Sequence, residues 1–192
     1  MGNPDQDRIQ AAMLPEGDVI GILLEQHARI KELFQAVRAT DGEQRVDRFN
    51  ELRALLAVHE TAEQVVLRHQ TAGAVNPAVA KARTDEEVEA TKILAELEAL
   101  NVESPSFAAR FAEFEDAVNK HAEAEEAEEF PVILAGYTDE QRQRMGRMLS
   151  ATEKIAPTHA HPKVAGNTVA TVASMPIASI IDRAKDALRK AG

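Results

Sequence analysis

Four segments of the chain repeat apolar residues at spacings of three and four, the pattern of an amphipathic helix. The first begins after Asp18, a good helix N-cap, and the second follows a break with the sequence TDGEQ. The third and fourth begin at the dipeptides NP and SP, in which proline suits the first helical turn. Because the connections are short, we expect an all-α, up-down-up-down antiparallel four-helix bundle with additional C-terminal helices.

The inward faces of these helices are apolar over most of their length. Their predicted apolar members are Ile20, Leu23, Ile30, Phe34, Val37, Phe49, Leu52, Leu56, Val66, Ala90, Leu94, Leu97, Phe107, Phe111, Phe114 and Val118. Polar residues interrupt the same faces: His27 on the first, the pair His59 and Glu63 on the second, and the pair His121 and Glu125 on the fourth. Counted from the helix ends, these positions fall within about one turn of one level of the bundle.

We call the inward-facing His and Glu residues at this level the polar layer. Such a layer needs a compensating cation. Burying an imidazole or a carboxylate without a partner costs on the order of several kcal/mol. The chain has no cysteine, so a metal would be held by nitrogen and oxygen ligands alone. His and Glu four residues apart project from one helix face, and this set favours iron, manganese or zinc, with iron preferred for oxygen chemistry.

The motifs around these residues resemble the hemerythrin, or HHE cation-binding, family. They are LLEQHARIKELF around His27, HETAE from His59 and HAEAEE from His121, and the similarity covers residues 18–135. The resemblance implies two non-haem iron ions, oxo- or hydroxo-bridged, inside the bundle. It further implies that His27 and His59 bind one iron, that His121 binds the other, and that Glu63 and Glu125 bridge them.

The third helix departs from the family pattern because it carries no histidine. Its sequence TDEEVEATKIL places Glu87 where a histidine is common, so we expect Glu87 as the substitute ligand, with Glu86 as the alternative. Hard anionic ligands favour the ferric state. The resemblance then implies a protein that reacts with O2, peroxide or NO, with peroxide consumption as the leading activity. The alternative is a non-catalytic module that senses or stores O2, NO or iron.

Composition excludes several other classes. The chain carries 22 Lys and Arg against 32 Asp and Glu, a net charge of −10, which argues against a nucleic-acid partner. The N-terminus lacks the pattern of a signal peptide, and the longest uncharged run is too polar for a membrane span. We therefore expect a cytoplasmic protein whose partners are small molecules.

Several polar residues near the motifs are expected to have no role at the metal. The acidic run Glu123, Glu126, Glu128 and Glu129 is predicted to be a solvated face, and Glu60 and Gln64 are predicted to be exposed. Histidines outside the helix faces are expected in a loop or a linker. These are His69, His159 and His161.

The chain divides into three parts around the bundle. Residues 1–17 are expected to be a flexible segment, and residues 18–135 the hemerythrin-like bundle. Residues 136–192 are expected to be a helical extension that contains a Pro-rich linker. Its first helix should start at Thr138 or Asp139, and a last helix should carry its apolar face from Ile177 to Leu188.

Overall fold

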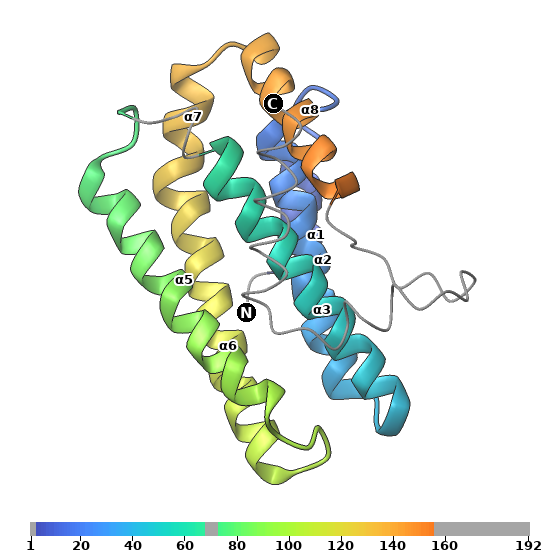
Figure 1. The fold of residues 1–192 in the computed structure, drawn as a ribbon. Helices are drawn as coiled ribbons and strands as arrows, with labels where there is room; N and C mark the ends of the chain where they lie inside the picture. Colours follow the sequence, from blue (N-terminus) through green and yellow to red (C-terminus); the bar gives the residue numbers. More distant parts are fainter. Residues whose placement is uncertain (1–2, 68–72, 156–192) are drawn as a thin grey trace.

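The bundle is formed by four long helical segments in a computed structural model that describes residues 3–67 and 73–155 (Figure 1). The first two are α2 (Val19–Ala39) and α3 (Gly42–Ala62), which continues as the π-helical turn η1 (Glu63–Leu67). The third is α5 (Pro77–Glu98). The fourth runs through α6 (Pro105–Ala124), the π-helical turn η2 (Glu125–Glu129) and α7 (Phe130–Gly136). The described residues contain no strand, so the predicted all-α bundle is confirmed.

Three of these helices begin at the caps that the sequence predicts. The side chain of Asp18 accepts a hydrogen bond from the Ile20 amide at 3.0 Å, and that of Asn76 accepts one from the Ala78 amide at 2.9 Å. Ser104 accepts one from the Phe107 amide at 3.1 Å. Each bond satisfies one amide that the first helical turn leaves without a carbonyl partner.

The core consists of two apolar clusters. The Phe-rich cluster contains Ile30, Leu33, Phe34, Val37, Phe49, Leu52, Leu56, Ala57, Ile93, Leu94, Leu97, Phe107, Phe111, Phe114 and Val118. The α8-side cluster contains Val19, Ile20, Leu23, Leu24, Val66, Leu67, Phe130, Ile133, Met145 and Leu149. Burial of each large side chain contributes about 1.5–3 kcal/mol. On α2, α3 and α6 the polar motif residues fall between the last member of one cluster and the first member of the other.

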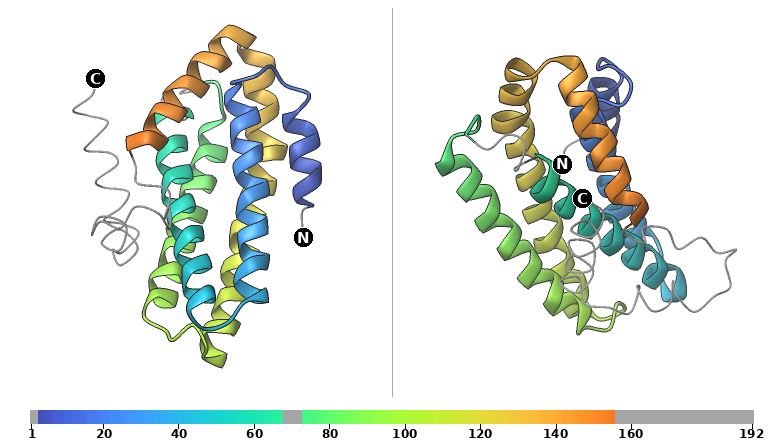
Figure 2. Two further views of the ribbon diagram at one scale, coloured as in Figure 1. Left: turned by 90° about the vertical axis from the view of Figure 1, so that its right-hand side faces the viewer. Right: turned by 45° about the horizontal axis from the view of Figure 1, so that its top comes forward.

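An additional helix, α1 (Pro4–Ala11), precedes the bundle and packs along α2 (Figure 2, left). The sequence predicts a flexible segment here, whereas Asn3 caps a helix with Pro4 in its first turn. The buried carboxylate of Asp7 contacts the buried Lys31 ammonium of α2 at 2.7 Å. Lys31 is four residues from His27, so α1 is anchored beside the polar layer.

The helix α8 (Asp139–Ile155) begins at a predicted position and covers one end of the bundle (Figures 1 and 2). Its Arg142 Nε donates to Asp18 Oδ2 at 2.7 Å, which links α8 to the cap of α2. Gly146 is required at the crossing because a Cβ atom there would lie 2.1 Å from the carbonyl oxygen of Gly17. Within residues 3–67 and 73–155, no helix is long and apolar enough to span a bilayer.

The predictions for His69, for the linker histidines His159 and His161, and for the last helix from Ile177 to Leu188 fall outside the described residues.

Candidate metal centre

Six buried side chains from all four helical segments of the bundle meet between the two apolar clusters. They are the six predicted metal ligands: His27, His59, Glu63, Glu87, His121 and Glu125. Each is at most 6 % exposed. Their ligand atoms form two groups, within each of which all atoms lie within 4.8 Å of one another. One group is His27, His59, Glu63 and Glu125, and the other is Glu63, Glu87 and His121.

The carboxylate of Glu125 connects the two groups. Its Oε2 lies 3.4 Å from Nε2 of His27, and its Oε1 lies 3.1 Å from Nε2 of His121. Glu63 belongs to both groups, and its Oε1 lies 3.5 Å from Nε2 of His59. Glu63 and Glu125 are thus both placed between the two halves of the layer.

Each His-x-x-x-Glu pair spans the junction between an α-helix and a π-helical turn. The turn η1 begins at Glu63 and η2 begins at Glu125. Short π-helical segments occur frequently at functional sites. Pro131 gives a reason for the second one, because its ring has no amide hydrogen and displaces the carbonyl four residues earlier. The irregular helices therefore coincide with the two carboxylates at the middle of the layer.

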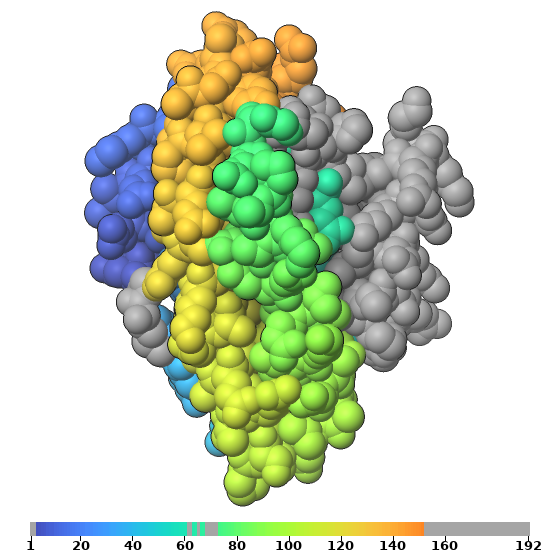
Figure 3. Space-filling model, turned by 90° about the vertical axis from the view of Figure 1, so that its left-hand side faces the viewer, coloured from blue at the N-terminus to red at the C-terminus, as the bar shows by residue number. Residues whose placement is uncertain are grey.

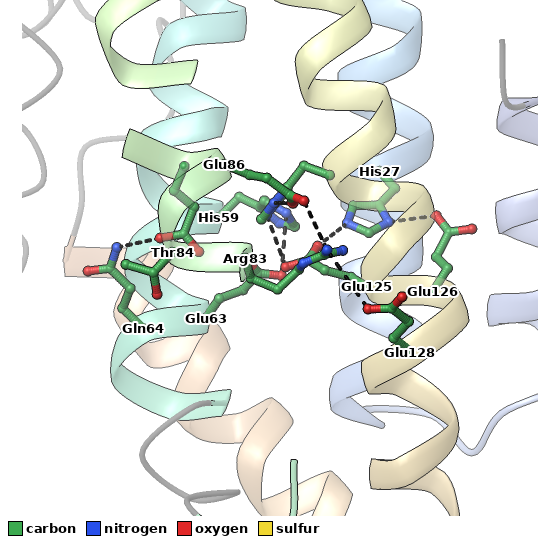
Figure 4. Close-up of polar contacts among 12 residues, drawn as sticks. His27, His59, Glu63, Gln64, Arg83, Thr84, Glu86, Glu125, Glu126 and Glu128 are labelled. Carbon is green, nitrogen blue, oxygen red and sulfur yellow. Dashed lines mark hydrogen bonds and ion pairs between the residues drawn. The ribbon is translucent and has the colours of Figure 1, made fainter. Parts of the chain in front are cut away.

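Each histidine of the layer is held through Nδ1, which leaves Nε2 toward the other ligand atoms. Figure 4 shows His27 between the carboxylates of Glu125 and Glu126. Nδ1 lies 2.8 Å from Glu126 Oε1 in His27, 2.7 Å from Gln26 Oε1 in His59, and 3.1 Å from Glu86 Oε2 in His121. An oxygen in this position accepts from an Nδ1–H group, and in that tautomer Nε2 would offer its lone pair to a metal. Partners of this kind fix the ring of a metal-binding histidine.

The donor set fits a metal pair. Three buried atoms, His27 Nε2, His121 Nε2 and Glu125 Oε2, make no hydrogen bond within the described residues. Atoms that bind one metal at about 2.0–2.2 Å lie about 3.0–3.5 Å from one another. The separations of 3.1 and 3.4 Å between Glu125 and the two histidines are in that range. Nitrogen and carboxylate oxygen are also ligands that iron accepts.

The surroundings of the layer lower the pKa of His59 and raise the pKa of His121. Burial, with the charges of His27 and His121, lowers the pKa of His59 to about 3, so this ring is neutral. Burial also disfavours the charged form of His121, but Glu125 outweighs it and raises the pKa to about 9. Burial would raise the pKa of Glu125, yet His121 and His27 hold it well below its ordinary value. In the metal-free layer, the positive charge of protonated His121 therefore compensates part of the negative charge that a metal ion would otherwise compensate.

The structure places the two candidates of the third helix differently. Glu87 lies in the layer, whereas Glu86 lies behind His121 and accepts from its Nδ1. Gln64, predicted to be exposed, is half-buried and donates to Glu87 Oε2 at 3.1 Å. Glu87, the residue that the family resemblance indicates on α5, is therefore the one that lies in the layer.

The expected solvated acidic face is partly inside. Glu126 is half-buried against His27, and Glu129 is 3 % exposed. Gln26, the partner of His59, is a further inward residue that no motif of the sequence indicates. Three partners of the histidines directly adjoin a predicted ligand in the sequence: Gln26 adjoins His27, Glu86 adjoins Glu87, and Glu126 adjoins Glu125. Adjacency alone does not show which side chain turns inward.

A cavity of about 20 Å³ adjoins the layer on the side of the Phe-rich cluster. Its apolar wall includes Ile30, Leu56, Ala90, Val118 and Ala122, and its polar wall includes the layer histidines, Glu60 and Asn119. This volume holds about one water-sized molecule. Figure 3 shows α5 and α6 packed side by side along one outer face of the bundle.

Comparison with known proteins identifies the family of the chain. A protein of Schizosaccharomyces pombe (strain 972 / ATCC 24843), described as an uncharacterized hemerythrin-like protein, is 21 % identical over 173 residues. The match covers 88 % of this chain and 85 % of the yeast protein. No solved structure matches the chain. The profile of the hemerythrin HHE cation-binding domain matches residues 18–133, more than half of the chain, and the chain therefore belongs to that family.

Proposed function

We propose that the layer holds two non-haem iron ions and that the protein consumes peroxide. His27 and His59 would bind one iron, His121 and Glu87 the other, and Glu63 and Glu125 would bridge them. The observation that carries this proposal is the position of Glu125, whose two oxygens face histidines of different halves at 3.4 and 3.1 Å. A carboxylate so placed suits two metals about 3.5–4 Å apart.

The ligand set supports peroxide chemistry over reversible oxygen carriage. Three carboxylates accompany three histidines, and anionic oxygen ligands stabilise the ferric state. In peroxide consumption, one H2O2 is reduced to two H2O with two protons and two electrons, and a second H2O2 is oxidised to O2 with release of the same number of each. The iron pair, when bound, would supply and recover these two electrons.

The surrounding residues would select small molecules and exclude bulk water. The cavity of about 20 Å³ admits a molecule the size of peroxide, O2 or NO, and its apolar wall offers no hydrogen bonds to a chain of waters. Glu60, half-buried at the cavity, is a group through which protons can exchange.

A second function, non-catalytic binding of O2 or NO, is favoured by the apolar part of the same wall. Neutral diatomic molecules need no hydrogen-bonding partner, and Ile30, Leu56 and Val118 offer none through their side chains. This function would use the same metal pair without turnover.

The test is metal analysis of protein produced with abundant iron, followed by optical spectra and O2 measurement after addition of peroxide. We expect about two irons per chain and O2 release at half the amount of peroxide consumed. Protein reconstituted with zinc is the control, since zinc has no redox chemistry. Two irons without O2 release, but with a stable O2 or NO adduct, would favour the binding function. No bound iron would overturn both.

A further inference from the structure

The histidines of the two halves of the layer are supported from outside by separate chains of charged groups. In the half that contains His27, Nδ1 lies 2.8 Å from Glu126 Oε1, and the same oxygen lies 3.7 Å from the Lys31 ammonium. Lys31 is 6 % exposed and contacts Asp7 of α1 at 2.7 Å. This series of charged groups therefore leads from Asp7 of α1 through Lys31 and Glu126 to His27.

The half that contains His121 has a similar chain on α5. Nδ1 of His121 lies 3.1 Å from Glu86 Oε2, and Glu86 Oε1 accepts from Arg83 Nη2 at 2.9 Å. Arg83 is 5 % exposed, and its Nη2 is also 3.8 Å from Glu128 of η2. Its Nε and Nη1 make no hydrogen bond within residues 3–67 and 73–155. A buried guanidinium with two nitrogens in this condition is costly, and this cost argues for a role beyond local stability.

In the part of the chain that the structure describes, Nδ1 of the third histidine contacts a neutral side chain instead. His59 is held by Gln26, a neutral amide, at 2.7 Å. The layer thus has two histidines backed by a carboxylate and a buried cation, one in each half, and one histidine backed by a neutral group. A carboxylate behind a metal-bound imidazole orients the ring and strengthens it as a donor. A cation behind the carboxylate fixes that carboxylate in place.

We propose that Lys31 and Arg83 are positioning residues, each for a different metal of the pair: Lys31 acts through Glu126 on His27, and Arg83 acts through Glu86 on His121. This inference rests on the proposed metal pair. It extends the centre beyond the family-matched residues 18–133, because Asp7 of α1 holds Lys31. The two metal positions are then tuned independently, one from α1 and α2 and the other from α5.

The test is an anaerobic titration with Fe(II), followed by calorimetry and by Mössbauer spectra of 57Fe-loaded protein. His27→Ala and His121→Ala first identify which binding step and which spectral signal belong to each half. Lys31→Met should then weaken iron affinity by about 10–100-fold at one step only, the step that is absent in His27→Ala, and leave the other step unchanged. Arg83→Met should do the reverse, and Lys31→Arg and Arg83→Lys should restore part of each loss.

Matched variants keep the test decisive. Lys120→Met removes an exposed cation next to His121 that pairs with Asp116, and it should change neither step. Asp7→Asn should weaken only the His27 step. If either Met variant does not fold, Glu126→Gln or Glu86→Gln tests the same half and should give an equally selective loss. Equal weakening of both steps, or no weakening, overturns the inference while the metal pair stands. Wild-type protein that binds fewer than two irons overturns the inference together with the proposed function.

Discussion

Gln64 donates a hydrogen bond to Glu87, with 3.1 Å between Nε2 and Oε2. The residue that follows Glu63 on the second helical segment thus orients the carboxylate of the third, and Glu87 is held in the layer. Glu86, one residue earlier, is held by Arg83 and faces His121 from behind. The two neighbouring glutamates therefore have different expected roles.

Glu87→Ala is expected to remove one metal ligand. Iron content should fall from about two toward one per chain, and the optical spectrum should change. Glu86→Ala should retain both irons under saturating conditions and weaken one binding step by about 10–100-fold, as the loss of an outer partner of a ligand does. Glu89→Ala, at an exposed position paired with Lys92, is the control. An unchanged iron content in Glu87→Ala would remove Glu87 from the ligand set.

Removal of the metal is expected to lower the thermal midpoint clearly, because binding to the folded layer adds directly to the free energy of unfolding. His59→Ala should lower the midpoint mainly in iron-loaded protein. Leu94→Ala, in the Phe-rich cluster, should cost about 2–5 kcal/mol in both forms. Calorimetric scans of both forms of each variant test this. Equal losses for His59→Ala with and without iron would identify His59 as a structural core residue.

The free energy of unfolding of the metal-free protein should fall on both sides of about pH 6.5, the ordinary histidine pKa. The pKa of His121 is raised to about 9 in the folded chain, so its contribution is complete below 6.5 and is lost as pH rises toward 9. The pKa of His59 is lowered to about 3, so its contribution is present above 6.5 and is lost as pH falls. Urea denaturation of metal-free protein from pH 4 to 10 should show a maximum near 6.5. His121→Gln should flatten the alkaline side, and an unchanged alkaline side would contradict the assignment.

Filling the cavity is expected to separate metal binding from reactivity. Ala122→Val adds two methyl groups beside a space of about 20 Å³. Iron content should stay near two per chain, while the rate of peroxide consumption or ligand binding should fall several-fold. The cost in stability should be about 1–3 kcal/mol, as for other overpacked cores. Stopped-flow spectra measure the rate, and Val118→Ala, which enlarges the same cavity, should raise it or leave it unchanged.

The sequence alone determined the bundle and brought six candidate ligands to one level. Apolar spacing is strictly local information, and the caps Asp18, Asn76 and Ser104 fixed where three helices begin. The spacing of His59 with Glu63 and of His121 with Glu125 required only that both residues share a helix face. The family resemblance indicates Glu87, which stands where a histidine is common, and Leu94 and Leu97 continue the same helix face.

Only the tertiary structure decided which polar neighbours turn inward. Glu126 and Glu128 have similar sequence surroundings, yet Glu126 contacts His27 while the side chain of Glu128 is half exposed. The difference arises because η2 widens the helix at Glu125 and because His27 of α2 reaches Glu126, and neither property is encoded in a period of 3.6 residues. The helix α1 is likewise held against α2 by pairings that include Asp7 with Lys31, 24 residues apart. Pairings between distant residues depend on how whole helices pack, whereas a local pattern reports only the face that one helix presents.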